Sequence, residues 1–238
     1  MKEVQYDPDF TDAAAIVKPM LDEEPDVLCW CTSYAPMVHA MTEQAFANGY
    51  GGQIMSCTLD EYDRLIERTG QDFMEGFLFQ FPDFDDPMLR EQAFFFNQPN
   101  QFFDEYNRRF PGSWSAVSWE YAAILDIWHA AVEECGTAHP TSGLAAMKQL
   151  GRVVHAFGPA VWWGEDRFGI DNALVGDWPV VTIEDGKARI MEFVSVPDWL
   201  NRHSALLKQE MTDLGQMWQQ RLSKSRGGGP LGQRAVGA

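Results

Sequence analysis

Residues 27–31 read VLCWC, residues 53–56 read QIMS and residues 76–81 read GFLFQF. Each stretch is short and mainly apolar, and amphipathic segments separate the three. Continuous apolar runs of this kind are typical of strands that are covered on both faces of a parallel sheet. Alternation of such strands with helices predicts an α/β protein.

The segments between these runs have helical periodicity. Apolar residues recur at helical spacing in 11–23, 37–48 and 58–70, which predicts three amphipathic helices. Gly49 follows the second segment, at the position where a left-handed residue ends many helices. Residues 11–81 therefore predict αβαβαβ order with short loops, as in half of a doubly wound domain.

Beyond residue 81 the pattern becomes mainly helical. Residues 180–193 alternate around an Asp185-Gly186 pair, which predicts two strands joined by a tight turn. Residues 223–238 are rich in glycine and poor in apolar residues, so we expect a disordered basic tail. The other segments with helical spacing are 100–110, 118–135, 143–150 and a long amphipathic stretch at 197–222.

The charge balance argues against several partners. The chain has 18 Lys and Arg residues against 35 Asp and Glu residues, a formal net charge of −17. Because a body this acidic repels phosphate groups, nucleic acid and anionic membranes are poor partners. No signal peptide opens the sequence, and no apolar run reaches the roughly 20 residues that a membrane span needs. These features alone predict a soluble cytoplasmic protein.

Cys29 and Cys31 are two residues apart on a predicted strand, so both side chains should lie on one face of it. A disulfide between them is awkward, because strand positions i and i+2 are separated by roughly 6.5–7 Å. A metal site would need further ligands, and the spacing to His39 and Cys57 matches no zinc pattern. We therefore expect the thiols to pack in the sheet, and we predict neither a metal nor a cofactor.

The predicted strands place polar side chains at one edge of the sheet. Ligands of open parallel sheets bind beyond the carboxyl ends of the strands, and here segments 32–36, 57–61 and 80–84 follow those ends. Ser33 and Tyr34 offer hydroxyl groups at the start of a predicted helix, where backbone N–H groups can also hold an anion. The structural alternative is that the hydroxyls before this helix only cap it.

Catalytic signatures are missing from the sequence. No Gly-rich phosphate loop follows a predicted strand, and the Ser and Cys residues have no base within local reach. We therefore predict a binding protein and no catalytic residues.

Four stretches, which together span about residues 5–195, carry a resemblance to a known family. They are YDPDFTDAAAIVKPMLDEEPDVLCWCTSYAPMVHAMTEQAFANGYGGQIM (6–55), MEGFLFQFP (74–82), FFDEYNRRFPGSWSAVSWEYAAILDIWHAAVEECGT (102–137) and FGPAVWWGEDRFGIDNALVGDWPVVTIEDGKARI (157–190). Their order resembles type I periplasmic binding proteins, the receptors of branched-chain amino acid and amide ABC importers. The resemblance implies two doubly wound parallel-sheet α/β lobes, of which the first is incomplete here.

The resemblance also implies how the chain is divided. We expect a second-lobe α/β segment at 1–79, a first-lobe segment at 80–175, a return to the second lobe with a β-hairpin at 176–196, a C-terminal amphipathic helix at 197–222 and the basic tail at 223–238.

Site residues can be carried over from the family by position. Tyr34 matches the second-lobe loop residue that closes over the ligand, and Ser33 is its neighbour. Amino-acid-binding members place a carboxylate just after the next strand, where this chain has Thr58, with Asp60 two residues on. A neutral hydroxyl cannot balance a buried ammonium group, so this departure puts an α-amino acid ligand in doubt. Trp119 or Tyr121, near the start of a long helix, matches a ligand contact of the family less closely.

The function implied by the resemblance is capture of a small polar solute for an ABC uptake system, without catalysis. Its partner would be a membrane permease, its location extracytoplasmic, and the chain an N-terminally truncated form. The alternative is a cytoplasmic ligand-sensing regulatory domain of the same fold, and a flavodoxin-like enzyme is a third hypothesis. The helix at 197–222 would pack on the body of the protein or on a partner.

Overall fold

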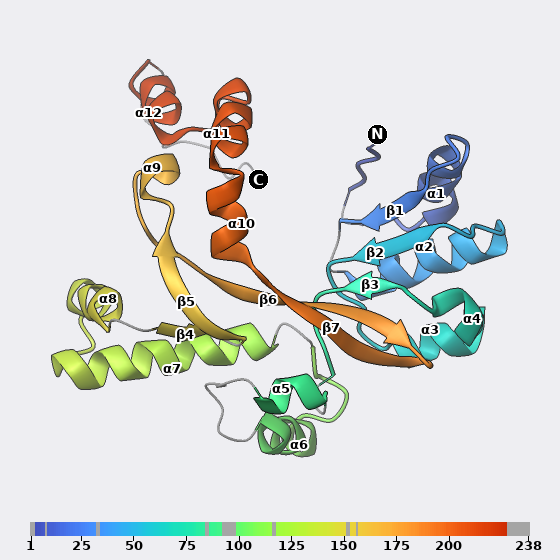
Figure 1. Cartoon of the computed structure of the whole chain (residues 1–238), viewed down its shortest axis with the longest axis horizontal. Helices are drawn as coiled ribbons and strands as arrows, with labels where there is room; N and C mark the ends of the chain where they lie inside the picture. Colours follow the sequence, from blue (N-terminus) through green and yellow to red (C-terminus); the bar gives the residue numbers. More distant parts are fainter. Residues whose placement is uncertain are drawn as a thin grey trace, which may run out of the picture. The chain divides into compact units, whose positions relative to one another are not determined.

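The computed structural model divides the chain into two compact units (Figure 1). Unit 1 comprises Met1–Asp126, Ala156–Gly158 and Trp178–Val194, and unit 2 comprises Ile127–His155, Pro159–Asp177 and Ser195–Ala238. The residues described are 3–7, 9–31, 34–83, 86–91, 99–115, 118–150, 153–155 and 157–227.

Unit 1 is built on a mainly parallel sheet. Strand β1 (Val27–Trp30) pairs in parallel with β2 (Gln53–Ser56), and β2 pairs in parallel with β3 (Leu78–Phe79). The second half of β6 (Ala173–Glu184) runs antiparallel to β3, and β7 (Lys187–Ser195) pairs with β6. The sheet confirms the predicted α/β class and its parallel strands.

The turn between β6 and β7 is the predicted Asp-Gly turn. Asp185 and Gly186 have φ angles of 51° and 71°. Two successive positive φ angles define the turn whose twist matches that of the flanking strands, and Asp-Gly is among the pairs that adopt it most readily. β6 begins at Ala173, well before the predicted 180, and β7 ends at Ser195, close to the predicted 193.

Helices of unit 1 cover one face of the β1–β2 pair. Helix α1 packs against α2, and α2 packs against α3. Leu28, Trp30 and Ile54 point from the strands into the same apolar core as these helices. The unit contains α1 (Ala13–Leu21), α2 (Ala35–Ala47), α3 (Tyr62–Thr69), α4 (Gln71–Met74), α5 (Pro87–Glu91), α6 (Pro99–Arg109) and the first half of α7 (Ser118–Cys135).

A buried polar chain links β1 to α2. Trp30 Nε1 donates to Thr42 Oγ1 at 3.0 Å, and the Thr42 hydroxyl donates to the Val38 carbonyl at 2.7 Å. Trp30 and Thr42 are both almost completely buried. Because a buried donor without an acceptor is destabilising, this chain fixes the register of the helix on the strand.

The opposite face of the β1–β2 pair is exposed, which differs from the prediction made from the sequence. Val27 is 48% exposed and Met55 is 38% exposed, and both cysteines of the VLCWC stretch are exposed. Burial therefore alternates along β1, and the expectation of a strand covered on both faces, with its thiols packed inside, is wrong. The apolar composition of the stretch did not reveal this, because Val, Cys and Met suit a covered face equally well.

The loop after β3 is fixed by two aspartates. Tyr62 Oη donates to Asp83 Oδ2 at 2.6 Å, and burial together with this carboxylate raises the pKa of Tyr62. Asp86 is 1% exposed and accepts backbone N–H bonds from Met88 and Ile190, each at 2.9 Å. Since Ile190 lies in β7, Asp86 ties this loop to a strand 104 residues further along the chain.

Unit 2 has its own antiparallel strands and a buried cation. Its β5 (Gly158–Trp163) pairs antiparallel with the first half of β6. Arg167 is 3% exposed, and its guanidinium carbon lies 4.8 Å from the ring centroid of Trp163. The other elements are α8 (Pro140–Gln149), β4 (Val153–His155), α9 (Glu165–Phe168), α10 (Val196–Arg202), α11 (Ser204–Asp213) and α12 (Trp218–Gly227).

The segment at 197–222 forms parts of three helices, where the sequence predicted one. His203 separates α10 from α11, and Gly215 follows α11 with a φ of 65°. A left-handed residue ends a helix, and glycine adopts that conformation without the penalty of a Cβ atom. Helix α12 extends to Gly227, which contradicts a disordered tail from 223, and residues 228–238 lie outside the described residues.

These helices pack on the body of unit 2. Met217 is 5% exposed, and a Cβ atom added to Gly169 would lie 2.8 Å from the Trp218 ring. Arg167 Nη2 donates to the Ser204 hydroxyl at 2.8 Å. Of the helices in the described ranges, none has both the length and the apolar character that a bilayer crossing requires.

Candidate functional site

The candidate site is the sheet edge at which β1 and β2 end. The two strands run in parallel from the pairing of Val27 with Gln53 to that of Trp30 with Ser56, so the segments that follow them leave the same edge. We call the group Tyr34, Thr58, Asp60 and Ser115 the β-edge site. All four residues belong to unit 1.

Tyr34 lies at the start of α2, beyond the end of β1. Its φ of −80° and ψ of 97° make it the N-cap residue, and its side chain is 59% exposed. Its role as a ligand contact stays a prediction. Its neighbour Ser33 lies outside the described residues.

Thr58 follows β2 and is 2% exposed. Its backbone carbonyl accepts a hydrogen bond from the Ser56 hydroxyl, which closes the turn at the end of the strand. The side chain is therefore inside unit 1, and a ligand could reach it only after local movement.

Asp60 is partly exposed and joins two segments that are distant in sequence. Its Oδ2 accepts a long hydrogen bond of 3.5 Å from the Ser115 hydroxyl, which stands just before α7. Its backbone carbonyl accepts a bond of 2.7 Å from His39 Nε2. The backbone of Asp60 is thus held by a group from α2, and its carboxylate is contacted by a hydroxyl from the approach to α7.

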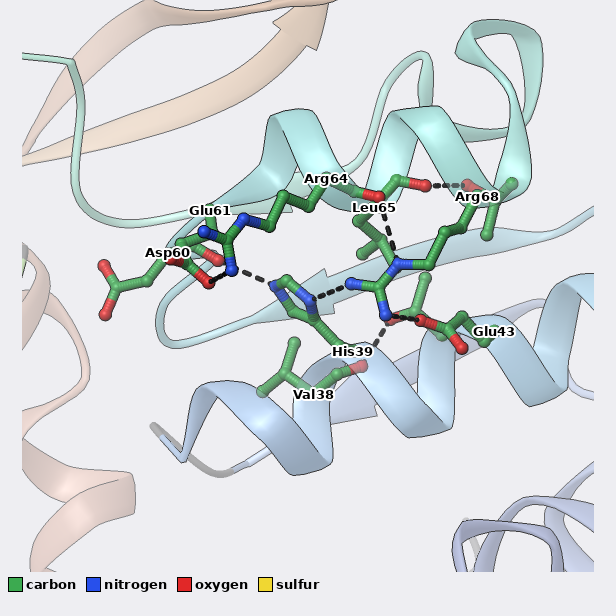
Figure 2. A network of polar contacts seen from close by, with 10 residues as sticks. Val38, His39, Glu43, Asp60, Glu61, Arg64, Leu65 and Arg68 are labelled. Carbon is green, nitrogen blue, oxygen red and sulfur yellow. Dashed lines mark hydrogen bonds and ion pairs between the residues drawn. The ribbon is translucent and has the colours of Figure 1, made fainter. Parts of the chain in front are cut away.

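The His39 ring connects Asp60 with Arg68 through its two nitrogen atoms (Figure 2). Arg68 Nη2 lies 2.9 Å from His39 Nδ1. Arginine can only donate, so Nδ1 accepts and the proton of the neutral ring is on Nε2, which donates to Asp60. Arg68 Nη1 also pairs with Glu43 at 2.7 Å. The network fixes both the tautomer and the orientation of the ring.

Sequence reasoning considered His39 as a possible metal ligand and did not connect it with Asp60. The ring is 7% exposed, on the buried side of α2 beside Val38 and Thr42. A histidine among buried helix positions signals a nearby partner, but the sequence does not identify that partner. Ser115 was missed as well, since nothing in its local sequence sets it apart.

Trp119 and Tyr121 belong to the first turns of α7. Their side chains lie outside the described residues, so their role as ligand contacts stays a prediction. The bond between Ser115 and Asp60 brings the loop before α7 to the β-edge site.

The chemistry available at the edge is recognition by an aromatic ring, a carboxylate and hydroxyl groups. Within the described ranges, no group of three or more His, Cys, Asp or Glu side chains is arranged to hold a metal ion. An aromatic face with a few oriented polar groups is the usual composition of a small-molecule site.

Comparison with protein families identifies the class. A family model described as periplasmic binding protein matches residues 1–188, which is most of the chain. The chain therefore belongs to the periplasmic binding protein family. This family consists of solute-binding proteins, and its type I α/β fold agrees with the parallel strands of unit 1.

Solved structures show the same fold at low sequence identity. A leucine-binding protein from Thermotoga maritima is 16% identical with a TM-score of 0.58, and the match covers 83% of this chain and 52% of that protein. A solute-binding protein of an ABC transporter from R. palustris, in complex with 4-hydroxybenzoate, is 17% identical with a TM-score of 0.57, over 81% of this chain and 50% of that protein.

A third structure is a branched-chain amino acid ABC transporter ligand-binding protein from Burkholderia xenovorans LB400. It is 11% identical with a TM-score of 0.55, and the match covers 81% of this chain and 50% of that protein. The chain thus spans about half the length of these relatives. No protein of curated function matches it.

Proposed function

We propose that this chain recognises a small polar solute for an ABC uptake system and carries out no chemical step. The observation that carries the proposal is the β-edge site of a periplasmic binding protein fold. There Tyr34 is exposed, His39 bonds the Asp60 backbone carbonyl, and the Ser115 hydroxyl donates to the Asp60 carboxylate. The family match favours transport over the alternative of a cytoplasmic sensor.

The ligand class follows from the side chains at the edge. Asp60 can accept hydrogen bonds from an ammonium or amide group, and Tyr34 can cover an apolar or planar part of the solute. Thr58 is buried, so Asp60 takes the place of the carboxylate that amino-acid-binding members have after this strand. We infer an amino acid, an amide or a related small polar solute, with Ser33, Trp119 and Tyr121 as additional contacts.

The partner and the location are part of the same proposal. The relatives with solved structures include binding proteins of ABC transporters, so the partner of this chain is a membrane permease and its site of action is extracytoplasmic. Because the chain spans about half the length of those relatives, we propose that it acts as the carboxyl-terminal half of a two-lobe receptor. The other lobe would complete the binding site.

The test is a ligand screen on two forms of the protein. The first is the chain itself, and the second is the chain fused to the amino-terminal lobe of the Thermotoga leucine-binding protein. Both are screened by thermal shift against leucine and other amino acids, amides, urea and 4-hydroxybenzoate, because a ligand that binds only the folded state raises the melting temperature. Hits are then measured by calorimetry.

Matched variants locate the site. Tyr34→Ala should weaken binding at least tenfold, whereas Phe110→Ala, which removes a ring of similar exposure (54%) in unit 1, should leave it unchanged. Asp60→Asn should weaken an ammonium ligand more than a neutral amide, because only the ammonium needs the negative charge. The proposal is wrong if no solute in the panel binds either form, or if Tyr34→Ala and Asp60→Asn both bind as tightly as the parent.

A further inference from the structure

The exposed face of the β1–β2 pair carries a group of sulfur atoms that the solute-binding function does not use. Cys29 Sγ and Cys31 Sγ lie 3.4 Å apart, and both residues are exposed. In the parallel register Cys29 stands beside Met55, and Cys57 directly follows Ser56, the partner of Trp30. Side chains that are neighbours in a parallel ladder share a face, so two thiols, a thioether and a third thiol gather there.

The electrostatics agree with this grouping. Burial and the adjacent Cys31 thiol raise the pKa of Cys29 to about 11, and Cys57 contributes in the same direction. The pKa of Cys57 is raised as well, by burial and by Cys31. The Cys29, Cys31 and Cys57 thiols therefore influence one another because they are close.

The backbone disfavours a direct bond between the two sulfurs. Cys29 is in β1 and Cys31 directly follows Trp30, the last residue of β1. In an extended chain, residues two apart have Cα atoms roughly 6.5–7 Å apart, at or beyond the upper end of the usual range for disulfides, which is about 6.8 Å. An ion bound between the two sulfurs does not require the shorter Cα separation of a disulfide. Two metal–sulfur bonds of about 2.3 Å span about 3.8 Å at a tetrahedral angle and about 4.6 Å when collinear. Small rotations of two exposed side chains reach either separation from 3.4 Å.

We propose that Cys29 and Cys31 form a two-thiolate binding site for a soft monovalent metal ion of the Cu(I) class. Thiolate and thioether ligands select this ion over Mg²⁺, Ca²⁺ and other ions that prefer oxygen. On binding, each thiol releases its proton to solvent and its sulfur donates an electron pair to the ion, with no change of oxidation state. Two ligands are sufficient for such an ion, and the site needs no third protein group.

The test is a competition titration under anaerobic conditions. The reduced protein is titrated with Cu(I) in the presence of a chromophoric Cu(I) chelator, whose absorbance reports the ion that the protein has not taken. One equivalent should bind. Cys29→Ser and Cys31→Ser should each lower the affinity more than about 100-fold, because loss of one of two ligands exceeds the 10–100-fold effect of an outer-shell partner. Cys135→Ser is the matched control and should bind as the parent does, and Cys57→Ser should differ by less than about threefold.

A second measurement needs no variant. Cu(I) should protect Cys29 and Cys31 of the parent protein from iodoacetamide and leave Cys135 reactive, as read by peptide mass mapping. Circular dichroism shows whether the serine variants fold. The proposal is overturned if Cys29→Ser binds Cu(I) as tightly as the parent, if Cys135→Ser or Cys57→Ser abolishes binding, or if Cu(I) protects neither Cys29 nor Cys31. Solute binding at the β-edge site is measured separately and does not depend on the result.

Discussion

His39 donates a hydrogen bond to the carbonyl of Asp60, 21 residues further along the chain, and Arg68 dictates which ring nitrogen does so. The bond connects the interior of α2 with the loop that presents the Asp60 carboxylate. A residue that the sequence analysis did not connect with the site therefore positions one of the predicted ligand contacts.

Replacement of this ring should destabilise the fold. His39→Leu fills similar space but removes the hydrogen bonds that the ring makes with the Asp60 carbonyl and with Arg68, which should lower the free energy of unfolding by about 1–3 kcal/mol. Urea unfolding gives the value. His129→Leu is the control, because that ring is 66% exposed and an exposed substitution should change stability by less than about 0.5 kcal/mol. Equal effects of the two changes would contradict the positioning role of His39.

The indole of Trp30 depends on a single hydroxyl in α2. Thr42→Val keeps the shape of the side chain and removes the acceptor at 3.0 Å from Trp30 Nε1, so the variant should lose about 1–3 kcal/mol. Thr212→Val is the matched control, because Thr212 makes the same hydroxyl bond to a carbonyl four residues earlier but on an exposed helix. Chemical denaturation of both variants measures the difference, and a loss as large for Thr212 would show that the indole bond contributes little.

Asp86 should be among the most sensitive acidic positions of unit 1. Asp86→Ala leaves two backbone N–H groups, those of Met88 and Ile190, without their acceptor, and the Ile190 N–H is in the buried part of the chain. Hydrogen bonds to charged groups contribute about 1.5–3 kcal/mol each, so a loss of at least about 2 kcal/mol is expected. Asp9→Ala, at an exposed position, should have almost no effect. Thermal and urea unfolding compare the two.

Alkylation of Cys29 should depend steeply on pH. With a pKa raised to about 11, its thiolate fraction increases about tenfold for each pH unit until about pH 11, and only the thiolate reacts. Iodoacetamide labelling followed by peptide mapping measures the rate at several pH values. The same protein in denaturant is the control, because unfolding removes burial and the neighbouring thiol, so its Cys29 should react faster at pH 8. An equal rate in the folded and unfolded states would contradict the described environment.

The sequence was sufficient for the features that depend on local chemistry. Alternating apolar runs and amphipathic segments predicted the α/β class, and the Asp185-Gly186 pair predicted the hairpin, because few residue pairs adopt two positive φ angles. Helix α7 was predicted with the observed ends. Gly215 was not recognised as the end of α11, since the apolar spacing continues across it and hides the break.

The candidate site was less accessible to sequence reasoning. Parallel strand order predicted which loops share an edge, and the register of β1 with β2 agrees. The side chains of those loops face outward or inward according to their contacts with segments that are distant in the sequence. Thr58 is buried, whereas Asp60 is held at the edge by His39 and Ser115, one from an earlier helix and one 55 residues later. No local pattern encodes such contacts.

The guanidinium of Arg167 sets a limit on how short the protein can be made. It lies on Trp163 and donates to both the hydroxyl and the carbonyl of Ser204. A chain cut at Ser195 would remove both Ser204 acceptors of Arg167 Nη2 and leave the guanidinium its pairing with Asp166 through Nη1. Trimming for crystallisation, or placement of a cleavable tag, must spare everything through Met217, because Ser204 bonds Arg167 and Met217 is buried.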